Sequence, residues 1–281
     1  MVTAADRAKG PARTSVWLGE KVTRTRRTDQ PDGLDLDKIT AATVRLLDSE
    51  GLAKFSMRRL AAELGVTAMS VYWYVDTKDD LLELALDAVM GELTLPGQAD
   101  GEEGGDKAGA EPEAAGVGNE PEADWRLQLR RLAAGYRSVL VRHPWVSPLV
   151  GVFLNIGPHA VEFSSAAQDV MRSADLPLRG QTGGLAAVFQ FVYGFGTVEG
   201  HFRDRCARAG MTQDEYHQHA MGTISEQPSL RRTFEQAQDV IAARGGDTVE
   251  EMRERDFDFA LDLLIAGIEA KRGEDPGLPG T

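Results

Sequence analysis

Residues 56–78 constrain the fold of this chain more than any other segment. They read SMRRLAAELGVTAMSVYWYVDTK, two short helical patterns separated by a break at Gly65. Ser56 suits the N-cap of the first helix, and the second helix is expected over about 68–74. The inward positions of the first helix are Leu60, Ala61 and Leu64. A short helix, a break and another short helix are the sequence outline of a helix-turn-helix.

Three consecutive aromatic residues, Tyr72, Trp73 and Tyr74, lie in the second helix. Successive helical residues turn by about 100°, so three in a row cannot all face one core. Val71 and Val75 are four residues apart and therefore share the face that packs on the preceding helices. At least two of the three rings are then expected to face outward, where a partner outside the protein can contact them.

The leading end of the second helix consists of small or slim side chains. These are Thr67, Ala68, Met69 and Ser70. Such side chains let the backbone come close to a groove floor, and the N-terminal residues of a recognition helix are the ones that reach base edges. The pattern therefore indicates that this end reads DNA.

Helical periodicity also accounts for the other patterned segments, and no convincing strand or internal repeat is present. One helix precedes the helix-turn-helix, with Asp35 or Asp37 as its N-cap and Gly51 as its stop. Thr77 and Asp80 match the capping pattern that opens the next helix. Further helices are expected near 125–142, 159–174, 181–203, 212–222, 229–243 and 250–271. The sequence predicts an all-α fold, with an N-terminal three-helix helix-turn-helix domain and a helical-bundle C-terminal domain.

Charge is distributed unevenly along the chain, whose net charge is −13. Residues 1–33 are expected to be a flexible basic arm, because seven basic side chains outnumber three acidic ones over its first 30 residues. Residues 95–124 carry nine acidic side chains against one basic and few large apolar ones, so they cannot bury enough surface to become ordered. The predicted divisions are the arm 1–33, a helix-turn-helix domain with its linking helix over 34–94, a disordered acidic loop over 95–124, a helical domain over 125–272 and a disordered tail over 273–281.

Two of the expected helices are apolar on more than one face. In 185–196, LAAVFQFVYGFG, apolar residues surround the axis, and Gly194, Gly196 and Gly200 are interpreted as close-packing positions. In 250–271 one stripe is Phe257, Leu261, Leu264 and Ile268, and a second is Phe259, Leu263, Ala266 and Ala270. A helix apolar on two faces must be covered on two sides. The second cover is either another helix of a monomeric bundle or a second subunit, and we favour a homodimer, partly because of the resemblance described below.

Several classes of function lack support in the sequence. Cys206 is the only cysteine, which excludes an internal disulfide and a cysteine-based zinc site. His217 and His219 are two residues apart and face different sides of a helix, so no metal site is expected. No signal-peptide core and no 18-residue apolar run is present, which favours a cytoplasmic protein without a membrane span. Because no nucleophile elbow, paired carboxylates or phosphate-binding loop is found, neither an enzyme nor a cofactor is expected.

Residues 34–89 resemble the N-terminal domain of the tetracycline-repressor family of bacterial transcription regulators. The resemblance rests on Leu46, Leu47 and Gly51 at a helix end, RRLAAELGV at 58–66, YWYV at 72–75, and Lys78, Leu81 and Leu82. Two later segments are more loosely similar to the ligand-binding domain of the tetracycline-repressor branch. They are YRSVLVRHP at 136–144 and RDFDFALDLLIAGIEA at 255–270.

The resemblance implies a DNA-binding transcriptional regulator. It would be a homodimer that occupies double-stranded operator DNA as a repressor and is released by a small-molecule effector bound in the C-terminal domain. Two alternatives remain open from the sequence. One is a regulator that acts through protein partners without a small ligand, and the other is a helical enzyme, for which no catalytic constellation is visible.

The resemblance also implies roles for side chains around the three rings. Arg58 matches a family position that meets a base or a phosphate, although a solvated arginine is the plain alternative. Tyr72 and Lys78 match phosphate-contacting positions, the latter at the start of a helix. Trp73 and Tyr74 are expected on the DNA backbone or groove wall, unless one ring packs on a neighbouring helix.

At the reading end, the resemblance implies both polar and apolar contacts. Thr67 and Ser70 are expected to meet phosphate or base. Ala68 and Met69 cannot make paired hydrogen bonds to a base edge, so contact with a thymine methyl group is expected there.

The basic arm lies outside the core motif. Arg24, Arg26 and Arg27 stand a few residues before the first helix, where an arm can enter a narrow minor groove. A floppy terminus is the alternative.

Five residues of the C-terminal half are candidates for lining an effector pocket, although such residues more often belong to a core. They are Trp145, Phe153, Phe189, Tyr193 and His201.

Overall fold

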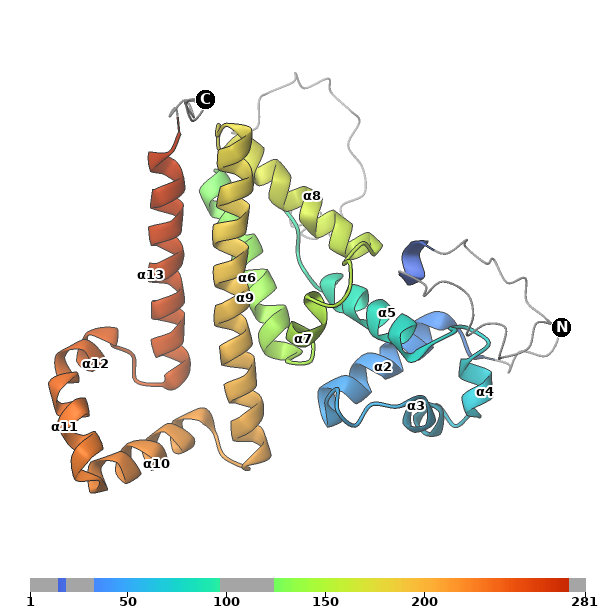
Figure 1. Cartoon of the computed structure of the whole chain (residues 1–281), viewed down its shortest axis with the longest axis horizontal. Helices are drawn as coiled ribbons and strands as arrows, with labels where there is room; N and C mark the ends of the chain where they lie inside the picture. Colours follow the sequence, from blue (N-terminus) through green and yellow to red (C-terminus); the bar gives the residue numbers. More distant parts are fainter. Residues whose placement is uncertain (1–14, 19–32, 97–123, 273–281) are drawn as a thin grey trace, which may run out of the picture. The chain divides into compact units, whose positions relative to one another are not determined.

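The computed structural model describes residues 15–18, 33–96 and 124–272, and in these ranges it contains helices and no strand (Figure 1). The described residues form two compact units. The first unit comprises those up to Leu93 together with residues 145–165, and the second comprises the rest. The prediction of an all-α fold with an N-terminal helix-turn-helix is confirmed.

Four helices of the first unit each begin at a side chain that accepts a backbone hydrogen bond. The helices and their caps are α2 (Leu36–Glu50) with Asp35, α3 (Met57–Glu63) with Ser56, α4 (Ala68–Val71) with Thr67, and α5 (Lys78–Met90) with Thr77. Such caps satisfy N–H groups that have no partner inside the helix. Asp80 completes the predicted capping box of α5. Gly51 ends α2 at a φ of 78°, in the left-handed region that favours glycine.

The core of the first unit lies where α2, α3, α4 and α5 meet. Its fully buried side chains include Ile39, Leu47, Leu60, Val71, Leu81 and Val89. Three shorter pieces complete this unit, namely the 3-10 turn η1 (Val16–Leu18), α7 (Ser147–Val150) and the start of α8 (Pro158–Ser173). Both η1 and α7 contact α5. The sequence predicted domains that are each continuous along the chain. In the structure, residues 145–165 instead pack with the first unit.

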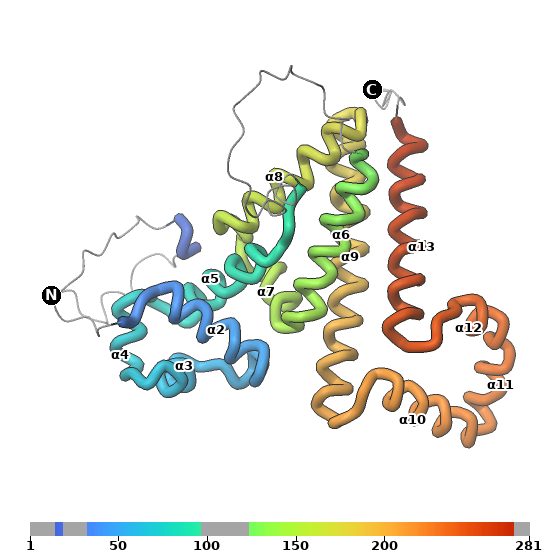
Figure 2. The backbone as a smooth tube through the Cα atoms, turned by 180° about the vertical axis from the view of Figure 1, so that it is seen from behind, coloured from blue at the N-terminus to red at the C-terminus, as the bar shows by residue number. Residues whose placement is uncertain are grey.

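The second unit is built around the longest helix. Its elements are α6 (Trp125–Arg142), the rest of α8, α9 (Leu178–Arg208), α10 (Gln213–Glu226), α11 (Pro228–Gln236), α12 (Gln238–Arg244) and α13 (Val249–Ala270). α9 lies beside both α6 and α13, and both views of the chain show this arrangement (Figures 1 and 2). α9 is therefore the central helix of this unit.

Two glycines allow α9 to approach α6 closely. A Cβ at Gly200 would lie 2.7 Å from the carbonyl oxygen of Leu140, and one at Gly196 would lie 3.0 Å from the Leu140 Cβ. These two positions confirm the close-packing interpretation. The interpretation is wrong for Gly194, which has nothing within 4 Å of a built Cβ.

α9 extends beyond the predicted range 181–203 at both ends, α10 ends at Glu226 rather than near residue 222, and the helix limits differ from the prediction at two further places. α4 ends at Val71 rather than near residue 74. The N–H of Tyr74 donates at 3.0 Å to the carbonyl oxygen of Val71, three residues earlier, which makes a tighter turn than that of an α-helix. The single helix predicted over 229–243 is two helices, which separate at Ala237 (φ −94°, ψ 4°). Neither glycine nor proline marks that break, so no sequence signal indicated it.

Candidate nucleic-acid interface

The short helix α4 is fixed by its cap and by two valines. The Thr67 hydroxyl oxygen accepts from the Ser70 N–H at 3.2 Å and lies 2.9 Å from the Ser70 hydroxyl. Val71 and Val75 are buried, as their spacing predicted. The N-terminal end of α4 and the side opposite the valines are consequently presented to solvent.

The side chains that α4 presents are mostly apolar. Met69 is 68% exposed, Tyr72 is 42% exposed and Trp73 is 38% exposed. Ala68 and Ser70 are half-buried between them. The expectation that at least two of the three rings face outward is met by Tyr72 and Trp73.

Tyr74 differs from the two rings before it. Its hydroxyl donates to the carbonyl oxygen of Leu34 at 2.6 Å, and its ring is half-buried. The tighter turn that ends α4 points this ring toward the start of α2. Its hydrogen-bonding capacity is used inside the unit, so we correct its predicted role and assign Tyr74 to the fold rather than to DNA.

The two arginines of α3 have different surroundings. Arg59 forms ion pairs with Glu50 at 2.7 Å and Glu63 at 3.2 Å, and the hydrogen bond to Glu50 raises its pKa. Arg58 is exposed and has no ion pair among the described residues. Arg59 thus ties α3 to the end of α2, and Arg58 is the arginine that remains available to a phosphate or base.

Lys78 is the first residue of α5, the helix that follows α4 in the chain. Its ammonium group sits 5.5 Å from the centre of the Phe55 ring, a cation–π contact that orients the side chain. The first turn of α5 also carries Asp79 and Asp80, and Asp80 accepts the N–H groups of Asp76 and Thr77. Lys78 is therefore the cation that this helix start can offer to a phosphate.

The basic arm is anchored at one point that the sequence did not indicate. The Ser15 hydroxyl donates to the buried carboxylate of Glu83 on α5, and the Val16 N–H donates to the same carboxylate at 2.8 Å. The prediction of a flexible arm is wrong for residues 15–18, because a buried carboxylate needs donors and these residues supply them. Arg24, Arg26 and Arg27 lie outside the described residues.

The five candidate effector residues fall into both units. Trp145 and Phe153 belong to the first unit, and Phe189, Tyr193 and His201 lie on α9 in the second. Trp145 is only 4% exposed, and its indole N–H donates to Asp48 of α2 at 2.7 Å. We correct its predicted role, because that bond and its burial make Trp145 a core residue of the first unit.

Aromatic rings gather where α9 meets α6. Phe189 packs edge-on against Tyr136 with ring centres 6.1 Å apart. Burial, with a smaller contribution from Tyr193, raises the pKa of Tyr136 to about 12. The phenol group of Tyr136 is therefore neutral at physiological pH and hydrogen-bonds as a neutral group.

A buried ion-pair network joins three helices of the second unit. The Arg137 guanidinium on α6 binds both carboxylate oxygens of Glu199 on α9, at 2.8 and 3.2 Å, and Glu254 on α13 at 2.6 Å. It also lies 4.4 Å from the ring centre of Phe257. Burial opposes the positive charge, but the hydrogen bonds to the two carboxylates raise the pKa of Arg137 overall.

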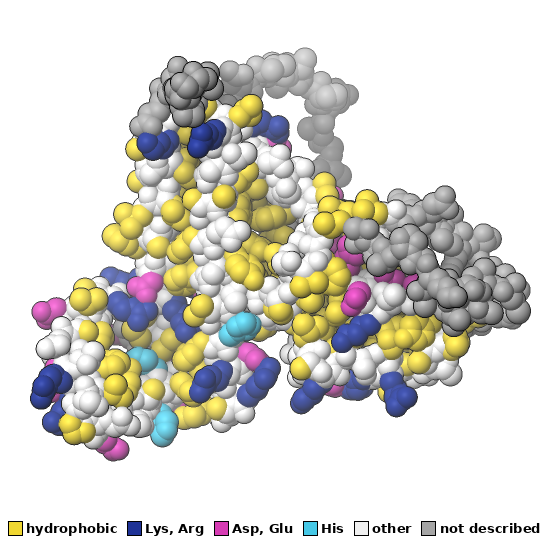
Figure 3. Space-filling model, viewed as in Figure 1, with side chains coloured by type: hydrophobic (Ala, Val, Ile, Leu, Met, Phe, Trp, Pro, Cys, Tyr) yellow, Lys and Arg dark blue, Asp and Glu magenta, His cyan; other side chains and the backbone are white. Residues whose placement is uncertain are grey.

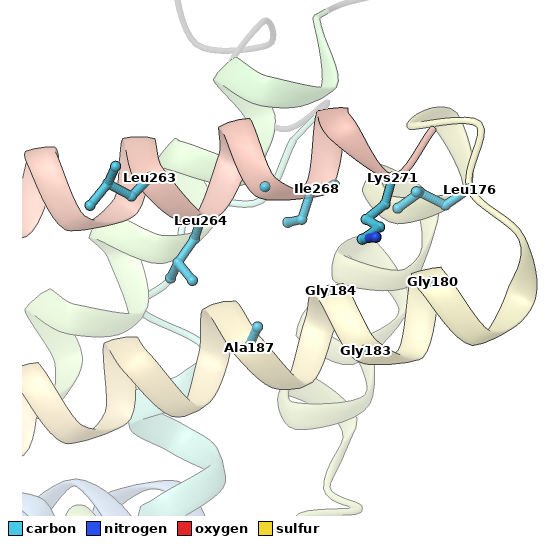
Figure 4. A pocket seen from close by; sticks show the side chains of 10 residues that line it. Leu176, Gly180, Gly183, Gly184, Ala187, Leu263, Leu264, Ile268 and Lys271 are labelled. Atoms are coloured by element: carbon cyan, nitrogen blue, oxygen red, sulfur yellow. The ribbon is translucent and has the colours of Figure 1, made fainter. Parts of the chain in front are cut away.

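A cavity of about 330 Å³ opens between the first half of α9 and the end of α13 (Figure 4). Its walls are formed by Leu176, Gly180, Gly183, Gly184, Ala187, Leu263, Leu264, Gly267, Ile268 and Lys271. Apart from Lys271 these are glycines and apolar side chains, which suits an apolar occupant.

The described residues lack two further kinds of feature. No helix among them is long and apolar enough to cross a membrane. No group of three or more His, Cys, Asp or Glu side chains in residues 15–18, 33–96 and 124–272 could bind a metal ion.

Comparison with known proteins gives matches over both halves of the chain. The family described as bacterial regulatory proteins, tetR family, matches residues 39–85. The family described as tetracyclin repressor-like, C-terminal domain, matches residues 117–272. Together these two matches include the helix-turn-helix and all of α6 to α13.

Individual relatives match over nearly the full length. An HTH-type transcriptional regulator of Saccharopolyspora erythraea is 32% identical over 92% of this chain and 93% of its own. The HTH-type transcriptional repressor DrrR1 of Streptomyces coeruleorubidus is 28% identical over 94% of this chain and 88% of its own. Among solved structures, ActR of Streptomyces coelicolor in complex with actinorhodin has the same fold, with a TM-score of 0.61 at 23% identity over 87% of this chain and 99% of that one.

Proposed function

This chain belongs to the tetR family of bacterial regulatory proteins, and from that premise we propose that it is a homodimeric repressor that a small molecule releases from its operator. Its relatives are named as transcriptional regulators and a repressor. The observation that carries the proposal is the outward-facing surface of α3 and α4, where exposed Arg58, Met69, Tyr72 and Trp73 lie beside a core built from Val71.

We assign the DNA contacts by what each side chain can still offer. Arg58 and Lys78 supply charge to phosphates, and the Tyr72 hydroxyl supplies a donor while its ring packs on the sugar backbone. Trp73 is placed on the groove wall. Tyr74 and Arg59 are left out, because both already have partners within the first unit.

Base reading is assigned to the leading end of α4. Thr67 and Ser70 share one hydroxyl–hydroxyl contact, so only one of their two protons remains free to donate to DNA. Met69 is the most exposed side chain of α4 and, like its neighbour Ala68, offers only apolar contact. We therefore expect the operator to carry thymine where Met69 meets the major groove.

The operator sequence provides the direct test. A random duplex library is selected with the full-length protein, and the bound duplexes are sequenced. The proposal expects a palindrome whose half-sites lie about one helical turn, 34–36 Å, apart or a multiple of it. It also expects Met69→Ala to relax the preference at one thymine in each half-site. Recovery of duplexes without any shared sequence contradicts the proposal.

The homodimer is supported by an uncovered apolar stripe on α13. Phe259 is 69% exposed and Leu263 is 60% exposed, and both belong to the second stripe predicted from the sequence. Hydrophobic side chains are also visible over α9 and α13 in the space-filling view (Figure 3). Leu263 also lines the cavity between the two helices, so the stripe and the cavity are continuous. A second copy of the chain, packed on this face, would cover both.

The effector is proposed to bind against aromatic residues of α9. Phe189 and Tyr193 lie on α9, and Tyr136 of α6 packs against Phe189. ActR, whose fold is similar, has been solved in complex with actinorhodin, which supports a small-molecule ligand for this chain. The test is a screen for compounds that release the selected duplex, followed by Phe189→Ala, which should weaken the response to any compound found.

A further inference from the structure

Three helices of the second unit meet at a corner that the proposed function does not use. The end of α9, the start of α10 and the start of α13 come together there. The Val249 N–H of α13 donates to Asp214 of α10 at 2.7 Å, which joins two of the helices. Phe202 of α9 and Tyr216 of α10 pack edge to face with ring centres 5.5 Å apart.

Arg253 of α13 lies over one ring of this pair. Its guanidinium carbon is 4.5 Å from the centre of the Phe202 ring. Its one hydrogen bond among the described residues is a long one, from Nη1 to the backbone carbonyl of Glu199 at 3.4 Å. Burial lowers the pKa of Arg253, which means that water solvates this cation less well than a surface arginine.

The lack of a carboxylate partner sets Arg253 apart from comparable arginines. Among the described residues, the arginines that are not fully exposed are Arg59, Arg126, Arg130, Arg137 and Arg253. The first four each form an ion pair with Asp or Glu, and Arg253 does not. The chain has 44 acidic residues against 31 basic ones, so this difference does not come from a shortage of acids.

Three carboxylates close to Arg253 in space or in sequence are engaged with other arginines. Glu199 and Glu254 bind Arg137, and Asp256 binds Arg244 at 2.9 Å. Arg253 is therefore a half-buried guanidinium that has no carboxylate partner among the described residues. A carboxylate from outside the chain would supply the ion pair that the other half-buried or buried arginines have.

A second cation flanks the same rings. The guanidinium carbon of Arg205, on α9, is 5.7 Å from the ring centre of Tyr216. Arg205 is exposed and has no ion pair within the described ranges. Arg253 thus lies against Phe202 and Arg205 against Tyr216, so each ring of the pair has one cation beside it.

We propose that this corner binds a small aromatic carboxylate. The planar fork of Arg253 matches a carboxylate with two parallel N–H···O bonds, and Phe202 with Tyr216 provides apolar surface for the ring of the ligand. Arg205 adds a second positive charge at the outer edge. Binding is a property of the second unit alone and requires neither DNA nor the effector contacts assigned above.

Isothermal titration calorimetry of the full-length protein with benzoate tests the proposal. Benzoate is expected to bind once per chain, and benzyl alcohol, which has the ring without the charge, at least about tenfold more weakly. Arg253→Gln should weaken benzoate binding at least about tenfold. The matched control is Arg203→Gln, which removes the same charge from an exposed arginine of α9 and should leave the affinity unchanged.

Three outcomes overturn the proposal. They are no binding of benzoate to the wild-type chain, equal binding to wild type and Arg253→Gln, and tighter binding of inorganic phosphate than of benzoate. Because DNA is absent from these titrations, their failure leaves the proposed repressor function unaffected, and failure of the operator selection leaves the carboxylate site unaffected.

A second variant separates ligand binding from a structural role. Arg253→Met keeps the length and the contact with Phe202 but removes the cation. If the cation serves a ligand, the thermal midpoint without ligand should stay the same or rise, because an unpaired desolvated charge is lost. Arg137→Met should lower the midpoint, since it leaves Glu199 buried without its partner. A drop for Arg253→Met as large as that for Arg137→Met overturns the proposal.

Discussion

The helices α5 and α13 differ in how their surfaces are covered. Ten of the 13 residues of α5 are buried, and they include the three carboxylates Asp80, Glu83 and Asp87. Each of these has donors in the same chain. In α13 only five of 22 residues are buried, and Phe259 and Leu263 remain exposed on the opposite side.

The difference teaches what a single copy of the chain can satisfy by itself. Buried carboxylates are tolerated on α5 because the surrounding segments bring N–H and O–H donors to them. The second stripe of α13 has no such cover, and an exposed apolar stripe marks a surface for another chain. The buried carboxylates of α5 therefore report packing within the chain, and the exposed stripe of α13 is the surface that we propose for a second copy.

The largest effect is expected on the covered side of α13. Phe257 is 1% exposed and packs on Phe191, Phe195 and the Arg137 guanidinium. Phe257→Ala should lower the free energy of unfolding by about 3–5 kcal/mol, through lost burial and the cavity left behind. Urea denaturation at a fixed protein concentration measures it. A loss below about 1 kcal/mol would show that this side of α13 is not a core.

A charge introduced on the exposed side of α13 should weaken dimer formation rather than folding. Phe259→Glu removes one ring per copy from the proposed interface, or about 3 kcal/mol per dimer, which corresponds to a Kd raised about a hundredfold or more. Sedimentation equilibrium measures the change, and circular dichroism should show helices unchanged. Val152→Glu, an exposed apolar position of the first unit, serves as the control. A wild-type chain that sediments as a monomer at micromolar concentration contradicts the dimer altogether.

A smaller loss is expected when α5 loses one of its carboxylates. Asp87 accepts the Ala160 N–H at 3.0 Å and lies 3.0 Å from the His159 ring nitrogen Nδ1, so it caps the start of α8. Asp87→Ala should cost about 2 kcal/mol of folding stability because the buried Ala160 N–H loses its acceptor and the start of α8 loses its cap. Asp79→Ala, at an exposed position of the same helix, should cost less than about 1 kcal/mol. Equal losses in urea denaturation would refute the capping role.

The smallest predicted effect concerns the rings of the interface. Tyr72→Ala should weaken binding to every duplex about tenfold, or about 1.4 kcal/mol, because a backbone contact carries no sequence information. Tyr74→Phe should leave DNA binding unchanged and lower folding stability by about 1 kcal/mol, since only the bond to Leu34 is lost. Gel shifts and thermal unfolding separate the two. A gel shift unaltered by Tyr72→Ala at moderate salt removes Tyr72 from the interface.

Features that depend on a fixed spacing of three or four residues were predictable from the sequence. The capping box of Thr77 and Asp80, the cap at Ser56 and the shared face of Val71 and Val75 all follow from helix geometry over three or four residues. Both apolar stripes of α13 follow from the same periodicity, with Ile265 buried where Leu264 was expected. The family resemblance added the expectation of a transcriptional regulator, which residue spacing alone does not provide.

Features that depend on distant partners were not predictable. The Tyr74 hydroxyl reaches Leu34 across 40 residues, Glu83 takes its donors from Ser15 and Val16 across more than 60, and Trp145 reaches Asp48 across 97. A polar side chain shows that it needs a partner, but only the fold decides which one. The assignments of Tyr74, Trp145 and the arm changed for this reason.

The membership of residues 145–165 in the first unit has a practical consequence for protein engineering. The Trp145 indole N–H donates a hydrogen bond to α2, and Asp87 of α5 caps the start of α8. A fragment cut after Leu93 would lose both contacts and expose the apolar surface beneath them. A DNA-binding unit transplanted between regulators should therefore carry this discontinuous segment with it, and chimeras joined within residues 95–124 alone are expected to be less stable than either parent.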